Sequence, residues 1–231
     1  GRETPQCAVR CRLPDDPESV RRALAPKDTA LRCAYLTNVL YNESDIPSAP
    51  SPITVSELED LLRKSPQGTL VLGISDAALG LPNADLFLGK WPDAPGAHNA
   101  VCICPLGPPP SGYARLVLYD APPELAPGAH LWTGRAAGWL NDLPDICAMR
   151  DLYRAARRGG GPNEAARAAG LSLPAAWAGL AVLEKLRLIA PGWGSGTIDP
   201  LPMAVRDIEN EPAFRRLQGA RGRARRGKGV T

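Results

Sequence analysis

The sequence is poor in the side chains and motifs that most often carry out catalysis. Only two histidines, His98 and His130, occur in 231 residues, and they stand far apart. The chain has no G-x-x-x-x-G-K-[ST] loop for nucleotide phosphates, no H-E-x-x-H metal motif and no G-x-S-x-G nucleophile motif. It also lacks a cluster of Asp and His suited to two divalent cations. The sequence therefore predicts no catalytic residue, no metal and no cofactor in this chain.

Long apolar runs are absent as well. No stretch of about 18 apolar residues exists, so we expect no helix that spans a membrane. The N-terminus lacks both a methionine and an apolar signal segment, which favours a fragment of a longer polypeptide over a secreted protein. Hydrophobic residues nevertheless make up 44% of the chain, which excludes a wholly disordered protein. The length allows one large domain or two small ones.

The six cysteines are best explained as reduced thiols in a cytoplasmic protein, because the chain is long and carries no export signal. Cys102 and Cys104 lie in an apolar run typical of a buried strand, where a free cysteine behaves as a small hydrophobic residue. We therefore expect them in the core. Cys7 and Cys11 would need two further ligands to hold zinc, so a structural zinc site is disfavoured.

Residues 1–145 have the pattern of an α/β domain. Short, nearly continuous apolar runs at 30–36, 69–74, 100–104 and 115–119 are typical of strands buried on both faces of a mostly parallel sheet. The segment 55–64 has apolar residues at helical spacing, and Ser56 with Glu59 predicts a capping box at its start. The link from Cys104 to Arg115 is too rich in proline for a crossover helix, so either that strand pair is antiparallel or the helix has been lost.

Two aspartates follow predicted strands, at the edge where α/β sheets bind ligands. Asp76 comes after the run at 69–74, and Asp120 comes after the run at 115–119. Because aspartate is also common in turns and helix caps, we favour a structural role for both.

The sequence pattern of residues 146–208 predicts a winged-helix-like domain. A helix with Met149 and Leu152 on one face ends at three glycines, a second runs from Pro162 to Ala169, and a third is capped by Ser172. A short strand at 188–190 and a glycine-rich turn at 192–196 complete the pattern. The third helix opens with Leu173 to Ala178, a stretch without Arg, Lys, Asn or Gln. Sequence-specific base contacts are therefore not expected from it, and a role in packing or in contact with another protein is preferred.

Charge is distributed unevenly along the chain. Residues 1–150 carry 13 basic and 17 acidic side chains, a net charge of −4, whereas residues 151–231 carry 14 and 7, a net charge of +7. The composition of residues 209–231 predicts a basic, disordered tail. Its seven basic residues form the candidate nucleic-acid-binding set, because clustered cations can neutralise phosphates; a merely solubilising tail is the alternative. The seven are Arg215, Arg216, Arg221, Arg223, Arg225, Arg226 and Lys228.

Several segments, in their order and spacing, resemble the C-terminal extension of Firmicutes-type RecJ single-stranded-DNA-specific exonucleases. They are Arg115 to Pro123, Met149 to Arg154, Ala168 to Ser172 leading to Val182 to Leu186, and Arg206 to Leu217. The resemblance spans about Thr29 to Gln218. In addition, the stretch from Thr69 to Pro82 resembles part of the second motor domain of helicases, which implies a degenerate motor-like fold without nucleotide chemistry.

The resemblance implies a parent enzyme that degrades single-stranded DNA from its 5′ end in DNA recombination and repair. Manganese or magnesium would be held by Asp and His residues of phosphoesterase domains that this sequence does not contain, so no catalytic residue can be carried over. The implied role of this chain is to support the nuclease core of the same polypeptide and to contact single-stranded DNA weakly or dock repair proteins. The alternative is a protein-interaction module that docks a repair partner and binds no DNA.

Overall fold

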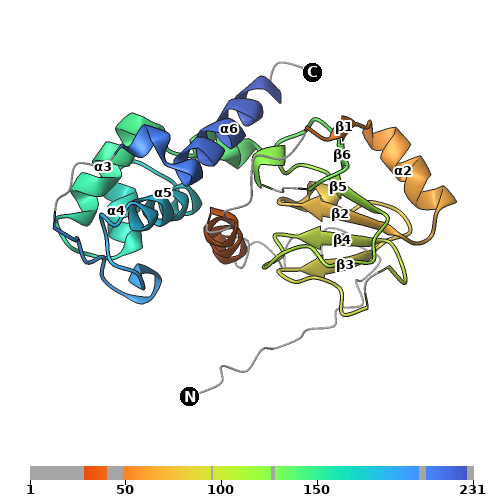
Figure 1. The fold of residues 1–231 in the computed structure, drawn as a ribbon, viewed down its shortest axis with the longest axis horizontal. Coiled ribbons are helices and arrows are strands. Elements are labelled where there is room, and N and C mark those ends of the chain that lie inside the picture. Colours follow the sequence, from red (N-terminus) through yellow and green to blue (C-terminus); the bar gives the residue numbers. More distant parts are fainter. Residues whose placement is uncertain (1–28, 41–48, 95, 126–127, 203–206, 228–231) are drawn as a thin grey trace.

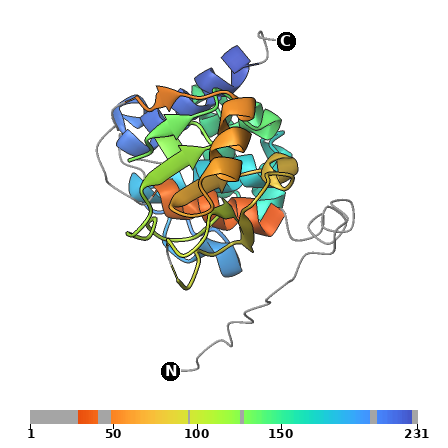
Figure 2. The ribbon, with the colours of Figure 1, turned by 90° about the vertical axis from the view of Figure 1, so that its right-hand side faces the viewer.

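The protein is an α/β protein in which a sheet half and a helical half lie side by side (Figure 1). The computed structural model describes residues 29–40, 49–94, 96–125, 128–202 and 207–227. Buried apolar residues of both halves belong to one continuous core. The views in Figures 1 and 2 place the helical half beyond one end of the strands.

A six-stranded, entirely parallel sheet forms the first half. Its strands are in the order β1-β6-β5-β2-β4-β3. Every residue of the interior strands β2 and β4 is buried, as expected for a parallel sheet covered on both faces. The strands are β1 (Ser51–Pro52), β2 (Thr69–Gly73), β3 (Asp85–Leu88), β4 (Ala100–Ile103), β5 (Arg115–Leu118) and β6 (Leu131–Trp132).

The proline-rich link from Cys104 to Arg115 joins two strands that are not neighbours. β4 and β5 lie on opposite sides of β2, and both run parallel to it. The link therefore returns to the amino end of the sheet without a helix, so the antiparallel alternative is wrong. Neighbouring loops pack against one another instead. Trp91 Nε1 donates to the Gly107 carbonyl at 3.1 Å, and a Cβ on Gly96 would lie 2.6 Å from the carbonyl oxygen of Gly112.

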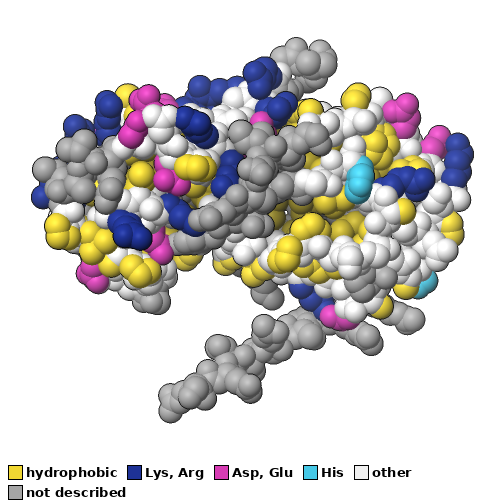
Figure 3. Space-filling model, in the orientation of Figure 1, with side chains coloured by type: hydrophobic (Ala, Val, Ile, Leu, Met, Phe, Trp, Pro, Cys, Tyr) yellow, Lys and Arg dark blue, Asp and Glu magenta, His cyan; other side chains and the backbone are white. Residues whose placement is uncertain are grey.

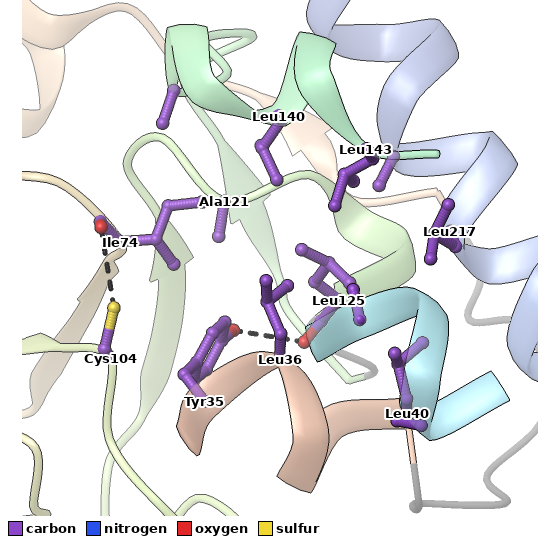
Figure 4. Packing of buried hydrophobic residues seen from close by; sticks show 14 of the residues in the cluster. Tyr35, Leu36, Leu40, Ile74, Cys104, Ala121, Leu125, Leu140, Leu143 and Leu217 are labelled. Atoms are coloured by element: carbon purple, nitrogen blue, oxygen red, sulfur yellow. Dashed lines mark hydrogen bonds between the residues drawn. The ribbon is translucent and has the colours of Figure 1, made fainter. Parts of the chain in front are cut away.

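The apolar run at 30–36 was expected to be a strand, and this is wrong: residues 29–40 form a helix. A short apolar run does not distinguish a strand from a buried helix, and Cys33, Leu36 and Leu40 have helical spacing. The helix packs beside the carboxyl ends of the strands (Figure 4). There, Tyr35 donates its hydroxyl proton to the Leu125 carbonyl at 3.2 Å.

Helix α2 (Val55–Lys64) has the predicted bounds but a different cap. The capping box is formed by Thr54 and Glu57, whereas Ser56 and Glu59 were expected. Thr54 Oγ1 accepts from the Glu57 amide at 3.2 Å, and Glu57 Oε2 accepts from the Thr54 amide at 2.8 Å. Both pairs fit the same sequence pattern, and the helix places Leu58 and Leu62 in the buried core.

The three helices predicted in the second half are present as α3 (Ile146–Ala156), α4 (Pro162–Ala168) and α5 (Leu173–Lys185). Helix α5 is buried from Pro174 to Leu183 except at Trp177, which confirms its packing role. Within the described part of the chain, no single helix is long and apolar enough to cross a membrane; α4 and α5 reach that length only as a pair bent by 105°.

The segment after α5 is less regular than expected. The predicted strand at 188–190 is reduced to one antiparallel bridge, between Ile189 and Pro200. The glycine-rich turn contains the 3₁₀ turn Trp193–Ser195 and folds back onto α5. Trp193 packs edge-on against Trp177 at 4.9 Å between ring centroids and donates Nε1–H to Glu184 Oε2 at 2.7 Å.

The basic end of the chain was expected to be disordered, and over its described part this is wrong. Residues Pro212–Gly227 form helix α6. Beyond Leu217 the segment has no large apolar residue within the helix, but alanines continue the apolar face at helical spacing. This face packs against the 3₁₀ turns η2 (Pro123–Leu125) and η3 (Gly138–Asp142) and against α5. Its buried residues are Ala213, Phe214, Leu217, Ala220 and Ala224.

Candidate nucleic-acid interface

Two of the predicted DNA-binding arginines form ion pairs within the protein. Arg221 Nη2 pairs with Asp145 Oδ2 at 3.0 Å, and its side chain is only 15% exposed. Arg223 Nε pairs with Glu124 Oε1 at 2.5 Å, with 33% of the arginine side chain exposed. These ion pairs tie α6 to the start of α3 and to η2. Arg221 and Arg223 therefore contribute mainly to the docking of α6.

Three arginines of α6 remain at the surface. Arg215 is exposed and hydrogen-bonds Asn210 Oδ1 and the Glu209 carbonyl, which leaves further guanidinium protons available. Arg225 and Arg226 are exposed in the last turn of the helix, where cations interact favourably with its dipole. We call these three residues the basic face of α6. In Figure 3, dark-blue Lys and Arg side chains lie along the upper edge of the helical half.

The other two predicted residues differ in their surroundings. Arg216 is half-buried and engaged in a contact, so it is not counted in the basic face. Lys228 lies outside the described residues.

Residues of the sheet half form an arginine–aromatic cluster with Arg223 of α6. Its other members are Tyr119, Trp132 and Arg135. The Arg223 guanidinium lies over the Trp132 ring, 5.4 Å from its centroid. Trp132 Nε1 donates to the Arg135 carbonyl at 3.1 Å. The Arg135 guanidinium lies 5.7 Å from the Tyr119 ring centroid and donates to the Tyr119 hydroxyl at 3.2 Å, while the Arg135 residue stays exposed. Trp132 and Arg135 were not among the site residues predicted from the sequence, because no local sequence signal indicates that β6 ends beside α6.

Asp145 connects α3 with α6 through both carboxylate oxygens. Oδ1 accepts from the Ala148 amide at 2.9 Å as the cap of α3, and Oδ2 receives Arg221. The Ala148 N–H bond, followed by the bond and charge of Arg221, holds the pKa of Asp145 below its ordinary value of 3.8. The ionised form is therefore favoured in the folded protein.

Replacing Asp145 by asparagine is expected to lower the free energy of unfolding by about 0.5 kcal/mol at neutral pH, because the cap is kept while the partly solvated charge is lost. A carboxyl whose pKa is lower in the folded state stabilises the fold only while it is ionised there. The difference from the wild type should therefore shrink as the pH falls below 3.8. Urea unfolding at neutral and acidic pH measures it. Asp142→Asn, at an exposed neighbouring position, is the control, and a difference that persists in acid would contradict the assignment.

The carboxyl edge of the sheet, where ligands bind in many α/β proteins, is occupied by structural contacts. The buried Asp120 carboxylate accepts from the amides of Ile74 at 2.7 Å and Ser75 at 3.1 Å, and from the Ser75 hydroxyl. Burial raises the pKa of Asp120, against the effect of these hydrogen bonds. The expected turn-stabilising role of Asp120 is confirmed. Asp76 is exposed at the start of the 3₁₀ turn Asp76–Ala78.

The described cysteines are free thiols. Cys33, Cys102 and Cys104 are buried, which confirms the core position expected for the last two, and Cys147 is exposed. Burial raises the pKa of Cys33 and of Cys102 to about 12, so both are neutral at physiological pH. Among the described residues, no three His, Cys, Asp or Glu side chains come close enough to hold a metal ion. Cys7 and Cys11 lie outside this part of the chain.

Comparison of the chain with protein-family models, with curated proteins and with solved structures found no match. The resemblance to RecJ-type exonucleases therefore stays a prediction based on the residues quoted for it.

Proposed function

We propose that this chain is the non-catalytic C-terminal region of a RecJ-like 5′–3′ single-stranded-DNA exonuclease, and that it contacts DNA through the basic face of α6. The proposal includes two fold assignments. The sheet is motor-like, and α3, α4 and α5 have a winged-helix-like arrangement. The observation that carries it is the position of Arg225 and Arg226, exposed at the end of a docked helix beside the arginine–aromatic cluster. Manganese or magnesium would act in the nuclease core of the parent enzyme.

The geometry favours contact with the DNA backbone over base readout. Guanidinium groups pair with phosphates whatever the base, and aromatic rings beside a basic surface are typical of single-strand binding. Helix α5, the element that would read bases in a helix-turn-helix protein, is largely buried. Because α6 is already docked, fewer side chains and less backbone must be ordered on binding than in a disordered tail.

Replacing Arg215, Arg225 and Arg226 together by glutamine is expected to weaken binding of a fluorescent oligothymidylate by about 10-fold to 100-fold at low salt. The slope of log affinity against log salt should become shallower by about 2, because each phosphate contact on a single strand contributes about 0.7. Fluorescence anisotropy over a salt series measures both quantities.

The matched control removes three charges from the sheet half, with Arg63, Lys64 and Lys90 replaced by glutamine. Binding by this control should stay close to the wild type. An equal loss in the two triple variants would mean that only net charge matters and would overturn the proposal. If the wild type itself binds no oligonucleotide at low salt, the result favours the alternative function, a protein-interaction module that binds no DNA.

A further inference from the structure

A second polar site lies at the amino end of the sheet, where β1, β5 and β6 begin. It is an open cavity of about 470 Å³. Among the described residues that line it, none is acidic. The lining residues are Ala49, Pro50, Ser51, Ala114, Arg115, Ala129, His130 and Leu131. On the surface of the sheet half in Figure 3, histidine and basic side chains lie next to each other.

His130 is held in one orientation by the strand next to it. Its Nδ1 accepts a hydrogen bond from the Leu116 amide at 3.0 Å, and its own amide donates to the Leu116 carbonyl at 2.9 Å. Because Nδ1 is the acceptor, the proton of the neutral ring must be on Nε2. The exposed imidazole therefore offers one N–H donor at a position that the backbone fixes.

Arg115 and Ser51 supply the other donors. Arg115 is the first residue of β5, its amide donates to the Gly68 carbonyl at 3.1 Å, and the residue is exposed. The Ser51 amide donates to the His130 carbonyl at 2.9 Å, which places β1 directly beside His130. Ser51, Arg115 and His130 thus line one cavity from three neighbouring strands, and their side chains carry a hydroxyl, a guanidinium and an imidazole N–H.

We propose that this cavity binds a small phosphate monoester. Its donors match the acceptor oxygens of a phosphate, and arginine pairs with phosphate in bidentate fashion. The volume is in the range of small-molecule sites, about 300 to 1,000 Å³. The basic face of α6 contributes no lining residue, so this site and the proposed DNA contact can succeed or fail separately.

Titration of the full chain with inorganic phosphate and with glycerol 3-phosphate, followed by NMR of backbone amides and histidine side chains, tests the proposal. Saturable shifts of the His130 ring and the Leu116 amide are expected, with dissociation constants of the order of millimolar at low salt. Chloride at matched ionic strength should not produce them. Stronger binding of glycerol 3-phosphate would indicate a phosphorylated metabolite, and equal binding would indicate the free anion.

Two variants remove donors with little change to the fold. In His130→Asn, the amide oxygen can still accept from Leu116 while the Nε2 donor is lost, and Arg115→Gln removes the charge. Each is expected to weaken phosphate binding about 10-fold. Arg154→Gln, at an exposed position in α3, is the control and should bind as the wild type does. Equal weakening in the control, or shifts that avoid His130 and Leu116, would overturn the proposal.

Discussion

Replacing Asn99 by leucine should lower the free energy of unfolding by about 3 to 5 kcal/mol, because the carboxamide is fully buried and serves several backbone groups. Its Oδ1 accepts from the Thr69 amide at 3.1 Å. Its Nδ2 donates to the Ser65 carbonyl at 2.6 Å and lies 3.3 Å from the Asn83 and 3.4 Å from the Leu62 carbonyl oxygen. This one side chain joins the end of α2, the start of β2 and the loop before β3.

Leucine has as many side-chain heavy atoms as asparagine, so the cost comes from unpaired backbone groups rather than from a cavity. Urea unfolding followed by circular dichroism measures it, and the denaturant slope should stay unchanged if only the native state is affected. Asn163→Leu, at an exposed position in α4, is the control and should cost less than about 0.5 kcal/mol. A cost below about 1 kcal/mol for Asn99→Leu would contradict the account.

Shortening Leu217 to alanine should cost about 2 to 4 kcal/mol, the usual range for removing a buried leucine side chain. Leu217 is 1% exposed and lies near Leu143 in the core (Figure 4). A disordered basic tail would show no effect. The matched control is Leu106→Ala, because Leu106 is 44% exposed and its loss leaves no cavity. Thermal and urea unfolding of the two variants distinguish a docked α6 from a solvated one.

The same substitution separates a docked helix from a flexible arginine tail in DNA binding. Leu217→Ala keeps every arginine of α6 but loosens the surface that positions them. If the docked helix forms the contact, oligonucleotide affinity should fall together with the protection of α6 amides in hydrogen exchange. Unchanged affinity with lost protection would assign the binding to charge alone.

Helices whose signals are local were predictable. The position of α2, the glycine break after α3 and the proline at the start of α4 follow from spacing and from residues that begin or end helices. The short apolar strands were also recognised, because a buried parallel strand needs little beyond a continuous apolar run. The helix at 29–40 was not recognised, because residues 30–36 have the same apolar character as a strand, and packing beside the sheet distinguishes the two.

The sequence by itself determined an α/β chain with an acidic first part and an arginine-rich end, since composition, short apolar runs and glycine or proline positions act locally. Only the tertiary structure decided which arginines face solvent. Arg221 and Arg223 find Asp145 and Glu124, 76 and 99 residues away in the chain, while Arg225 and Arg226 remain exposed. The helical repeat determines on which face of a helix a side chain lies. The acidic partner that it meets there comes from a distant segment, so the pairing depends on how the two halves pack together.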